Sequence, residues 1–351
     1  MGYRTIVVGT DGSVTAGVAQ QTAARLAKRC RAQLVIVCCY GPPGISRQMA
    51  ETLLSHAARA ARRERVEPVT ELRPGPPADA ILEVAEERSA DLVVVGNKGM
   101  GQATRFRLGS VPDRVAHSAS TDLLIVNSTG AVRGPSDAEE HPEKLYTRIV
   151  VGTDGSPTAS EAARKAFELA MMLRAEVTLV TASKDPIVAA ILLERTESGR
   201  PEGVKVRSRV VESDPLEAIR TVALDEGAGL IVVGNKGMSG ARRYLLGSVP
   251  NKVAHHAPTD VLIAKTVDRS VEEIVPGHGG VVDSGGRKVA VYRDEDGALH
   301  AVSPRCTHMG FTVDWNDAEG TWDCPCHGSR YRADGEVLRG PAEKSLAPQD
   351  L

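Results

Sequence analysis

The chain contains two copies of one sequence unit, and this repetition limits its fold more than any other feature. Residues 6–13 read IVVGTDGS, and residues 149–156 read the same letters. Residues 91–126 also match residues 229–264 at 23 of 36 positions. The first pair of segments is offset by 143 residues and the second by 138, so the second copy is shorter by five. Two domains of the same fold are therefore expected in tandem.

Each copy alternates short apolar runs with helix-like stretches. In the first copy, the apolar runs lie at 5–9, 33–39, 66–72, 91–95 and 122–126, and the helical patterns lie at 14–30, 46–64, 77–89 and 110–118. Nearly continuous apolar, β-branched runs are typical of strands that are buried on both faces. Strict alternation of strand and helix favours a parallel sheet with helices on both sides. We predict two tandem α/β units, each with a five-stranded parallel sheet.

The rest of the chain differs from the repeats in composition and in the length of its predicted strands. Residues 128–146 are rich in Gly, Pro, Ser and Glu, as linkers are. After residue 267 the strand candidates become short, at 288–292, 299–302 and 336–338, and a turn signal at 294–297 predicts a hairpin. The predicted domains are unit 1 at 1–129, a linker at 130–146, unit 2 at 147–267 and a small all-β domain at 272–351.

Each α/β unit carries the residues of a phosphate-binding site. An aspartate follows the first strand, and a glycine array that ends in Gly-Ser follows the fourth. Glycines let backbone N–H groups converge on an anion, and the start of a helix adds donors and a partial positive charge. The serine, followed by Val-Pro, is expected to be the N-cap of that helix. The candidates are Asp11, Gly96, Gly99, Gly109 and Ser110, and in the second unit Asp154, Gly234, Gly237, Gly247 and Ser248.

Tight turns alone would also explain these glycines, because a duplication preserves turns and binding sites alike. The spacing G-x-x-G, nine residues, then G-S occurs in both units and resembles the nucleotide-binding branch of the universal stress protein family. The resemblance covers residues 3–127 and 147–266. It implies a strand order of 3-2-1-4-5 and an ATP site, with Mg or Mn as the candidate ion, where strands one and four end.

The same resemblance implies a role for each candidate residue. Asp11 and Asp154 would contact the nucleotide sugar or the metal ion, and the glycines and serines would hold the ribose and the phosphates. Main chain near Cys38 and Thr181 would face the adenine. Because duplicated units commonly reproduce a twofold interface within one chain, the two units are expected to pack as an internal pseudo-dimer. His117, His255 and His256 lie at a helix end, where they favour the helix dipole, and no ligand role is assigned to them.

The C-terminal domain contains two short motifs with metal-binding side chains. One is Cys306-Thr-His308, and the other, fifteen residues later, is Cys324-Pro-Cys326-His327. In a Rieske-type 2Fe–2S cluster, two imidazoles replace two thiolates on one iron, so each motif would supply one ligand to each iron. The short spacing within a motif fixes the relative positions of its ligands. Two cysteines and two histidines would also suit a tetrahedral structural zinc ion.

The residues around these motifs closely resemble Rieske domains over about 272–351. The matching segments are PRCTHMG, Trp315-Asn316, WDCPCHGSRY and Gly340-Pro341-Ala342, of which the last resembles the proline loop that covers the cluster. The resemblance implies that the cluster ligands are Cys306, His308, Cys324 and His327. It also implies that hydroxyl groups of Ser329 and Tyr331 donate hydrogen bonds to the cluster and a ligand cysteine.

The chain departs from many Rieske domains at one position. In those domains a cysteine five residues after the first ligand forms a disulfide with the equivalent of Cys326. Phe311 occupies that place here, so Cys326 is expected to be a free thiol.

Composition and charge limit the partners of the chain. The net charge of −2 gives no argument for nucleic acid or an anionic membrane, and no apolar run approaches the roughly 20 residues that span a bilayer. No signal-peptide pattern is present at the N-terminus, so a cytoplasmic protein is expected.

Three functions compete for this combination of domains. We favour an ATP-binding stress protein with a redox centre, acting in stress-linked redox sensing or electron transfer with a redox partner protein that the sequence does not identify. The alternative is an electron carrier for an oxygenase or another oxidoreductase, with the α/β units as a docking scaffold. A terminal oxygenase would need a mononuclear iron site in a large domain after the Rieske module, and only 24 residues follow His327. No general base stands out, so a stand-alone enzyme is not expected, and a homo-oligomer is left open.

Overall fold

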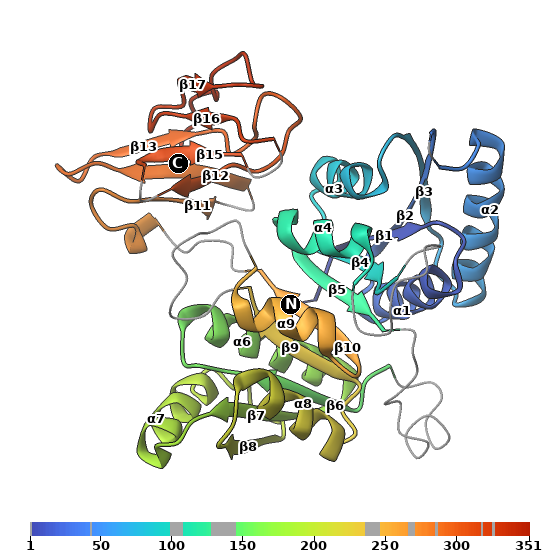
Figure 1. Ribbon diagram of the computed structural model, residues 1–351, viewed down its shortest axis with the longest axis vertical. Coiled ribbons are helices and arrows are strands. Elements are labelled where there is room, and N and C mark those ends of the chain that lie inside the picture. The colour runs from blue at the N-terminus through green and yellow to red at the C-terminus, as the bar shows by residue number, and fades with distance from the viewer. Residues whose placement is uncertain are drawn as a thin grey trace. The chain divides into compact units, whose positions relative to one another are not determined.

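The computed structural model describes residues 2–42, 44–98, 108–127, 145–235, 246–265, 271–284, 287–316, 319–324 and 327–351. The chain divides into two compact units, whose elements are labelled in Figure 1. The first unit contains both repeats, and its described residues end at Lys265. The described residues of the second unit begin at Val271.

The two repeats have the same order of elements. The first contains β1 (Thr5–Thr10), α1 (Val14–Cys30), β2 (Gln33–Tyr40), α2 (Arg47–Arg63), β3 (Val69–Pro74), α3 (Pro77–Glu87), β4 (Leu92–Gly96), α4 (Ser110–Ser118) and β5 (Asp122–Val126). The second contains β6 (Arg148–Gly152), α6 (Pro157–Leu173), β7 (Glu176–Ala182), α7 (Pro186–Glu197), β8 (Val206–Val211), α8 (Pro215–Asp225), β9 (Leu230–Gly234), α9 (Ser248–His256) and β10 (Asp260–Ala264).

The predicted elements agree with the observed ones at most boundaries. The helices expected at 14–30 and 110–118 and the strand expected at 122–126 have the predicted bounds. The third strand, expected at 66–72, lies at 69–74. The Val66 N–H group donates to the Ala61 carbonyl at 3.1 Å, so residue 66 is held in the turn after α2 and the strand begins later.

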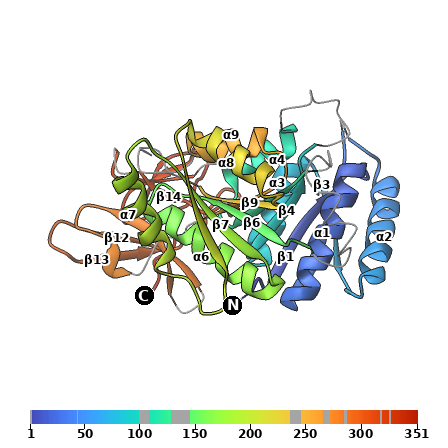
Figure 2. The same ribbon diagram turned by 90° about the horizontal axis from the view of Figure 1, so that it is seen from below.

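The described strands of both repeats form one ten-stranded sheet with the order β3-β2-β1-β4-β5-β10-β9-β6-β7-β8. Within each half the order is the predicted 3-2-1-4-5, and neighbouring strands are parallel. The halves are not separate sheets, because β5 and β10 pair antiparallel, with Leu124 opposite Leu262. In Figure 2, α3, α4, α8 and α9 cover one face of this sheet and α1 and α6 the other. The predicted internal pseudo-dimer is confirmed.

The loop after the first strand of each repeat turns the chain into a capped helix. In the first repeat, the Ser13 hydroxyl accepts a hydrogen bond from the Ala16 N–H group at 3.2 Å, and α1 begins at the next residue. In the second repeat, Ser156 caps α6 through the Ala159 N–H group at the same distance. A serine at the N-cap satisfies one of the donors that a helix start leaves without an intrahelical partner. The repeated letters DGS therefore place a helix start beside the end of the first strand.

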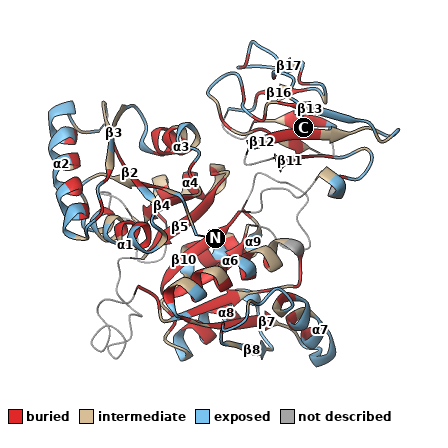
Figure 3. Ribbon diagram, turned by 180° about the vertical axis from the view of Figure 1, so that it is seen from behind, coloured by how far each residue is buried: buried red, intermediate tan, exposed pale blue. Residues whose placement is uncertain are grey.

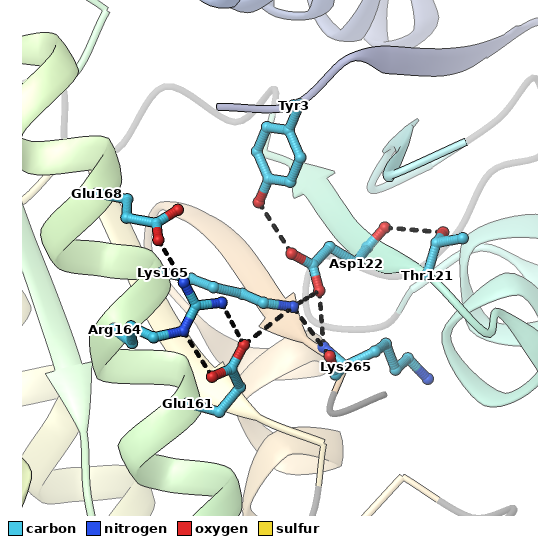
Figure 4. Close-up of polar contacts among 8 residues, drawn as sticks. All are labelled: Tyr3, Thr121, Asp122, Glu161, Arg164, Lys165, Glu168 and Lys265. Atoms are coloured by element: carbon cyan, nitrogen blue, oxygen red, sulfur yellow. Dashed lines mark hydrogen bonds and ion pairs between the residues drawn. The ribbon is translucent and has the colours of Figure 1, made fainter. Parts of the chain in front are cut away.

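A buried carboxylate at the start of β5 joins the two repeats. Asp122 is 4% exposed and accepts hydrogen bonds from the Tyr3 hydroxyl at 3.0 Å and from the Lys265 N–H group at 2.9 Å. The Lys165 ammonium group, from α6, forms an ion pair with the same carboxylate (Figure 4). Lys165 also donates to the Lys265 carbonyl at 2.9 Å. The first repeat is thus tied to the second through a charged group that is shielded from water.

The pseudo-twofold relation reproduces part of this network around Asp260, at the start of β10. Asp260 accepts from the Tyr146 hydroxyl at 2.7 Å and from the Asn127 N–H group at 2.8 Å. The first-repeat position that corresponds to Lys165 is Thr22, so the equivalent lysine is missing from the sequence there. The interface therefore repeats the hydrogen bonds of a tyrosine hydroxyl and a main-chain N–H group around both aspartates, and Asp122 adds the ion pair with Lys165.

The second unit is built from short antiparallel strands after a 3₁₀ turn (Val271–Glu273). Its described sheets have the orders β11-β12-β13 and β14-β15-β16-β17. The strands are β11 (Gly279–Ser284), β12 (Arg287–Arg293), β13 (Leu299–Val302), β14 (Asp314–Asn316), β15 (Thr321–Asp323), β16 (Arg330–Tyr331) and β17 (Val337–Arg339). The predicted hairpin is confirmed between β12 and β13, where Asp294 accepts from the Ala298 N–H group at 2.7 Å and Gly297 has a φ of +87°.

Aromatic side chains fill the interior of this small unit. Trp315 and Trp322 are buried, and their ring centroids lie 5.0 Å apart in an edge-on arrangement. Tyr292 of β12 stacks on Trp315 at 4.7 Å, which connects the two sheets. Figure 3 shows buried residues along the strands of both units. Among the described residues, no helix is long and apolar enough to cross a membrane.

Candidate functional site

The two Cys/His motifs form loops of the same backbone design. In the first loop, the Cys306 N–H group donates to the Phe311 carbonyl and the Gly310 N–H group donates to the Cys306 carbonyl, both at 2.8 Å. In the second, the Cys324 N–H group donates to the Ser329 carbonyl at 2.7 Å and the Gly328 N–H group donates to the Cys324 carbonyl at 3.1 Å.

Each loop depends on its glycine. Gly310 and Gly328 have φ values of +75° and +74°, in the left-handed region that glycine adopts without strain. With these glycines, each loop closes on its own cysteine and fixes the direction of the thiol.

The two loops place thiols inside the domain and imidazoles at its surface. Cys306 is 2% exposed and Cys324 is 4% exposed, whereas His308 and His327 are exposed. The two imidazole rings lie edge to face, with centroids 5.0 Å apart. The loops therefore bring the two thiols together in the interior and the two imidazoles together at the surface.

Hydrogen bonds around Cys306 favour its thiolate, the form that binds metal. A hydrogen bond with Cys324 is the main cause that lowers the pKa of Cys306 to about 5, with further contributions from Tyr331, the His308 main chain and Ser329, against the opposing effect of burial. The Tyr331 hydroxyl lies 3.0 Å from the Cys306 sulfur. Burial and the neighbouring Cys306 raise the pKa of Tyr331 to about 12, so Tyr331 keeps its proton as a donor.

Ser329 and Tyr331 are both completely buried. The Ser329 hydroxyl accepts from the Ala342 N–H group at 3.0 Å, so the segment predicted to resemble a proline loop lies against it. The Tyr331 oxygen accepts from the Thr307 N–H group at 3.1 Å, which orients the phenol. Thr307, between the first two predicted ligands, was not singled out from the sequence, although its place inside the motif could have indicated it.

The donor set fits a two-iron cluster better than a single zinc ion. A zinc site needs four ligands that converge on one point. Within the described ranges, no three His, Cys, Asp or Glu side chains form such a group. A pair of buried thiols and a pair of exposed imidazoles instead match the two thiolates and two imidazoles of a 2Fe–2S cluster. Cys326, expected to be a free thiol, lies outside the described residues.

The predicted phosphate-binding residues of the first repeat gather where β1 and β4 end side by side. Asp11 directly follows β1, and its carboxylate accepts from the Ser13 N–H group at 2.9 Å. Gly96 ends β4, and a Cβ atom there would lie 2.9 Å from the Thr15 carbonyl oxygen, so this glycine permits close packing against α1. Gly109 donates its N–H group to the Asn97 carbonyl at 3.0 Å, which closes the turn before α4.

The second repeat reproduces these contacts. Asp154 accepts from the Ser156 N–H group at 3.0 Å, a Cβ atom at Gly234 would lie 2.8 Å from the Thr158 carbonyl oxygen, and Gly247 donates to the Asn235 carbonyl at 2.9 Å. Gly99 and Gly237 lie outside the described residues. Asn97 and Asn235 were not selected from the sequence, although the repeated letters GNKG could have indicated them.

The prediction that Ser110 and Ser248 are N-caps is wrong. The N-caps of α4 and α9 are Gly109 and Gly247, and each serine is the first residue of its helix. Among the described side chains, none caps either helix. The physical reason is that an extended glycine at the turn already starts the helix. Among the described side chains, none therefore competes with an anionic ligand for the first N–H groups of α4 and α9.

Cys38 and Thr181 lie near the C-terminal end of the second strand of their repeats, β2 and β7. Cys38 pairs with Thr10, the last residue of β1, so the main chain of β2 beyond it no longer has β1 as a neighbour. In the second repeat, Thr181 follows Val180, the last residue of β7 that pairs with β6. Both side chains are buried, so only their main chain could contact a ligand.

Comparison with known proteins identifies the repeats. The model of the universal stress protein family matches residues 2–127, 145–200 and 188–265. The chain belongs to the universal stress protein family. A universal stress protein of Mycolicibacterium smegmatis is 30% identical over 213 residues, which are 56% of this chain and 68% of that protein. The crystal structure of a universal stress protein from Archaeoglobus fulgidus covers 74% of this chain and 98% of its own, with a TM-score of 0.59 and 20% identity, and shows the same fold.

This universal stress protein also carries a C-terminal Rieske domain. The model of the Rieske [2Fe-2S] domain matches residues 264–349. A Bacillus subtilis protein named as a Rieske 2Fe-2S iron–sulfur protein, YhfW, is 54% identical over 84 residues. That match covers 24% of this chain and 16% of the relative, so the chain spans only a small part of its length. The tandem repeats are therefore fused to a domain of the iron–sulfur electron-carrier type.

Proposed function

We propose that this universal stress protein binds ATP in both repeats, holds a 2Fe–2S cluster in its Rieske domain, and acts in stress-linked redox sensing or electron transfer. The observation that carries the redox part is the pair of loops with matching hydrogen bonds. They bury Cys306 and Cys324 and leave His308 and His327 exposed.

In this proposal the four side chains of the loops are the cluster ligands. When bound, the cluster would take up and release one electron. Cys306 and Cys324 bind as thiolates in the interior, and Tyr331 and Ser329 direct hydrogen bonds to Cys306. Such hydrogen bonds favour the state with more negative charge. The exposed imidazoles place one edge of the site at the surface, where a redox partner protein can approach.

The nucleotide part rests on the contacts that both repeats share. Asp11 and Asp154 are proposed to contact the sugar or a bound Mg or Mn ion. The glycine turns and the starts of α4 and α9 are proposed to hold the phosphates, because no described side chain caps those helices. The main chain at Cys38 and Thr181 is proposed to face the adenine. The family resemblance and the open helix starts support ATP as the ligand.

Electron paramagnetic resonance of the reduced protein, with and without ATP, tests both parts together. We expect a Rieske-type 2Fe–2S spectrum that changes when ATP is added. Cys306→Ser should abolish the signal, and a variant with aspartate at both Gly109 and Gly247 should keep the signal but lose its response to ATP.

Two other results of this experiment would change the proposal. A spectrum without any 2Fe–2S signal in freshly reconstituted protein would overturn the redox assignment. A cluster signal that is indifferent to ATP, together with electron transfer to an oxygenase component, would instead identify an electron carrier whose repeats are a docking scaffold.

A further inference from the structure

We propose that His255, which belongs to the second repeat, positions the phosphate-binding turn of the first repeat. This inference rests on the proposed ATP binding and adds that the first nucleotide site is completed across the interface between repeats. The two repeats form one compact unit with a shared sheet, so the contact lies within a single body.

The contact is made at the residue directly before the turn glycine. The Leu108 N–H group donates to His255 Nδ1 at 3.2 Å. Gly109, the next residue, donates its own N–H group to Asn97 at 3.0 Å and forms the N-cap of α4. The following N–H groups, of Ser110 and Val111, have no acceptor within the helix. His255 therefore orients the main chain immediately before the donors that the proposal assigns to phosphate.

The second nitrogen of His255 contacts α4 itself. Because Nδ1 accepts a hydrogen bond, the neutral ring carries its hydrogen on Nε2. Nε2 lies 3.2 Å from a carboxylate oxygen of Asp113, in the first turn of α4. One imidazole from α9 thus bridges the turn and the helix of the other repeat, and it fixes the angle between them.

The pseudo-symmetric position lacks the same arrangement. His117 corresponds to His255, and Asn251 corresponds to Asp113. His117 Nδ1 is buried and has no hydrogen-bond partner among the described residues, and the same holds for Asn251 Oδ1. The support therefore runs in one direction, from the second repeat to the first. The first site should depend on residue 255, and the second should not depend on residue 117.

The experiment separates the two sites and the two ring nitrogens. ATP binding to the first site is measured by isothermal titration calorimetry in a Gly247→Asp background, in which only that site remains. Into this background we introduce His255→Asn, whose Oδ1 can replace Nδ1 as the acceptor for Leu108, and His255→Gln, which reaches toward Asp113 but lacks the acceptor near Leu108. His56→Gln, at an exposed position of α2, is the control, because His117 itself lies 3.8 Å from the Asp113 carboxylate oxygen that His255 contacts.

We expect His255→Gln to weaken ATP binding at the first site on the order of two- to tenfold, as loss of one hydrogen bond does, and His255→Asn to retain affinity near that of the background. The control should leave it unchanged. Equal losses for the Asn and Gln variants, or no loss for either, would overturn the positioning role. Absence of ATP binding in the wild-type protein would refute the proposed nucleotide function itself, and it is distinguishable because no variant is needed to see it.

Discussion

Gly109→Asp should remove the nucleotide site of the first repeat and leave the fold intact. Gly109 is the N-cap of α4, with φ −67° and ψ 164°, an extended conformation that aspartate adopts without strain. An aspartate there can accept from the Val111 N–H group, since Pro112 has none to offer. Aspartate and glycine caps differ by only a few tenths of a kcal/mol, so the free energy of unfolding should change by less than about 0.5 kcal/mol.

The effect on binding is expected to be far larger than the effect on stability. The new carboxylate would occupy the donors that the proposal assigns to phosphate, so the two anions would lie about 4 Å apart. Two unit charges at that distance repel by about 4 kcal/mol at an effective dielectric constant of 20. At about 1.4 kcal/mol for each factor of ten, ATP should bind the altered site about a thousandfold more weakly.

Isothermal titration calorimetry with ATP decides this prediction. The wild-type protein should bind two equivalents, and Gly109→Asp should bind one. Gly109→Asn is the matched control, because it has the same shape and capping ability without the charge, and it should lose only about tenfold in affinity at this site. Two unchanged sites in the aspartate variant would refute the reasoning, as would an asparagine variant that binds as poorly as the aspartate one.

Three further predictions concern the cluster and the interface between the repeats. Ser329→Ala should lower the cluster potential by about 50–100 mV in protein-film voltammetry, and Tyr331→Phe should lower it by a similar or smaller amount. A lost hydrogen bond to a charged group changes the free energies of the two redox states unequally, and about 59 mV corresponds to 1.4 kcal/mol. Unchanged potentials would show that these hydroxyls do not act on the cluster. Asp122→Asn should destabilise the repeats by about 3–5 kcal/mol in denaturant unfolding, since it leaves Lys165 without its buried partner; a cost below about 1 kcal/mol would contradict a stabilising role for this ion pair. Cys306→Ser should abolish the visible absorbance of the cluster and leave ATP stoichiometry at two, because the repeats form a compact unit that does not need the cluster in order to fold; loss of both ATP sites would contradict this.

Much of the architecture could be predicted because local pattern and global fold agree. The apolar runs of each repeat have the length and composition of strands buried on both faces. Because the two repeats are similar in sequence, the fold predicted for one is also predicted for the other. The antiparallel pairing of β5 with β10 could not be predicted from the sequence. Leu124 and Leu262 look like ordinary interior residues of separate sheets, and nothing in their local sequence states which edges meet.

The site was predictable to the extent that its chemistry is carried by motifs. The predicted cluster ligands come together as a pair of cysteines and a pair of histidines, because two short loops each close on one cysteine. The N-cap of α4 was misassigned to Ser110, because residue preference alone favours serine over glycine there, while the backbone of the turn decides the position. His255 was set aside for a similar reason, since its contact with Leu108 exists only once the two repeats are assembled.

The pairing of β5 with β10 also determines how the protein responds to dilution. Two identical chains that meet edge to edge separate when their concentration falls below the dissociation constant of the dimer. Here both edges belong to one polypeptide, so the encounter is intramolecular and its effective concentration does not depend on the number of molecules in the cell. The interface residues of the two repeats also need not be identical, as they must be in a dimer of identical chains, so the two sides of the interface can differ in sequence. Lys165 facing Asp122, where the other repeat has Thr22, is such a divergence.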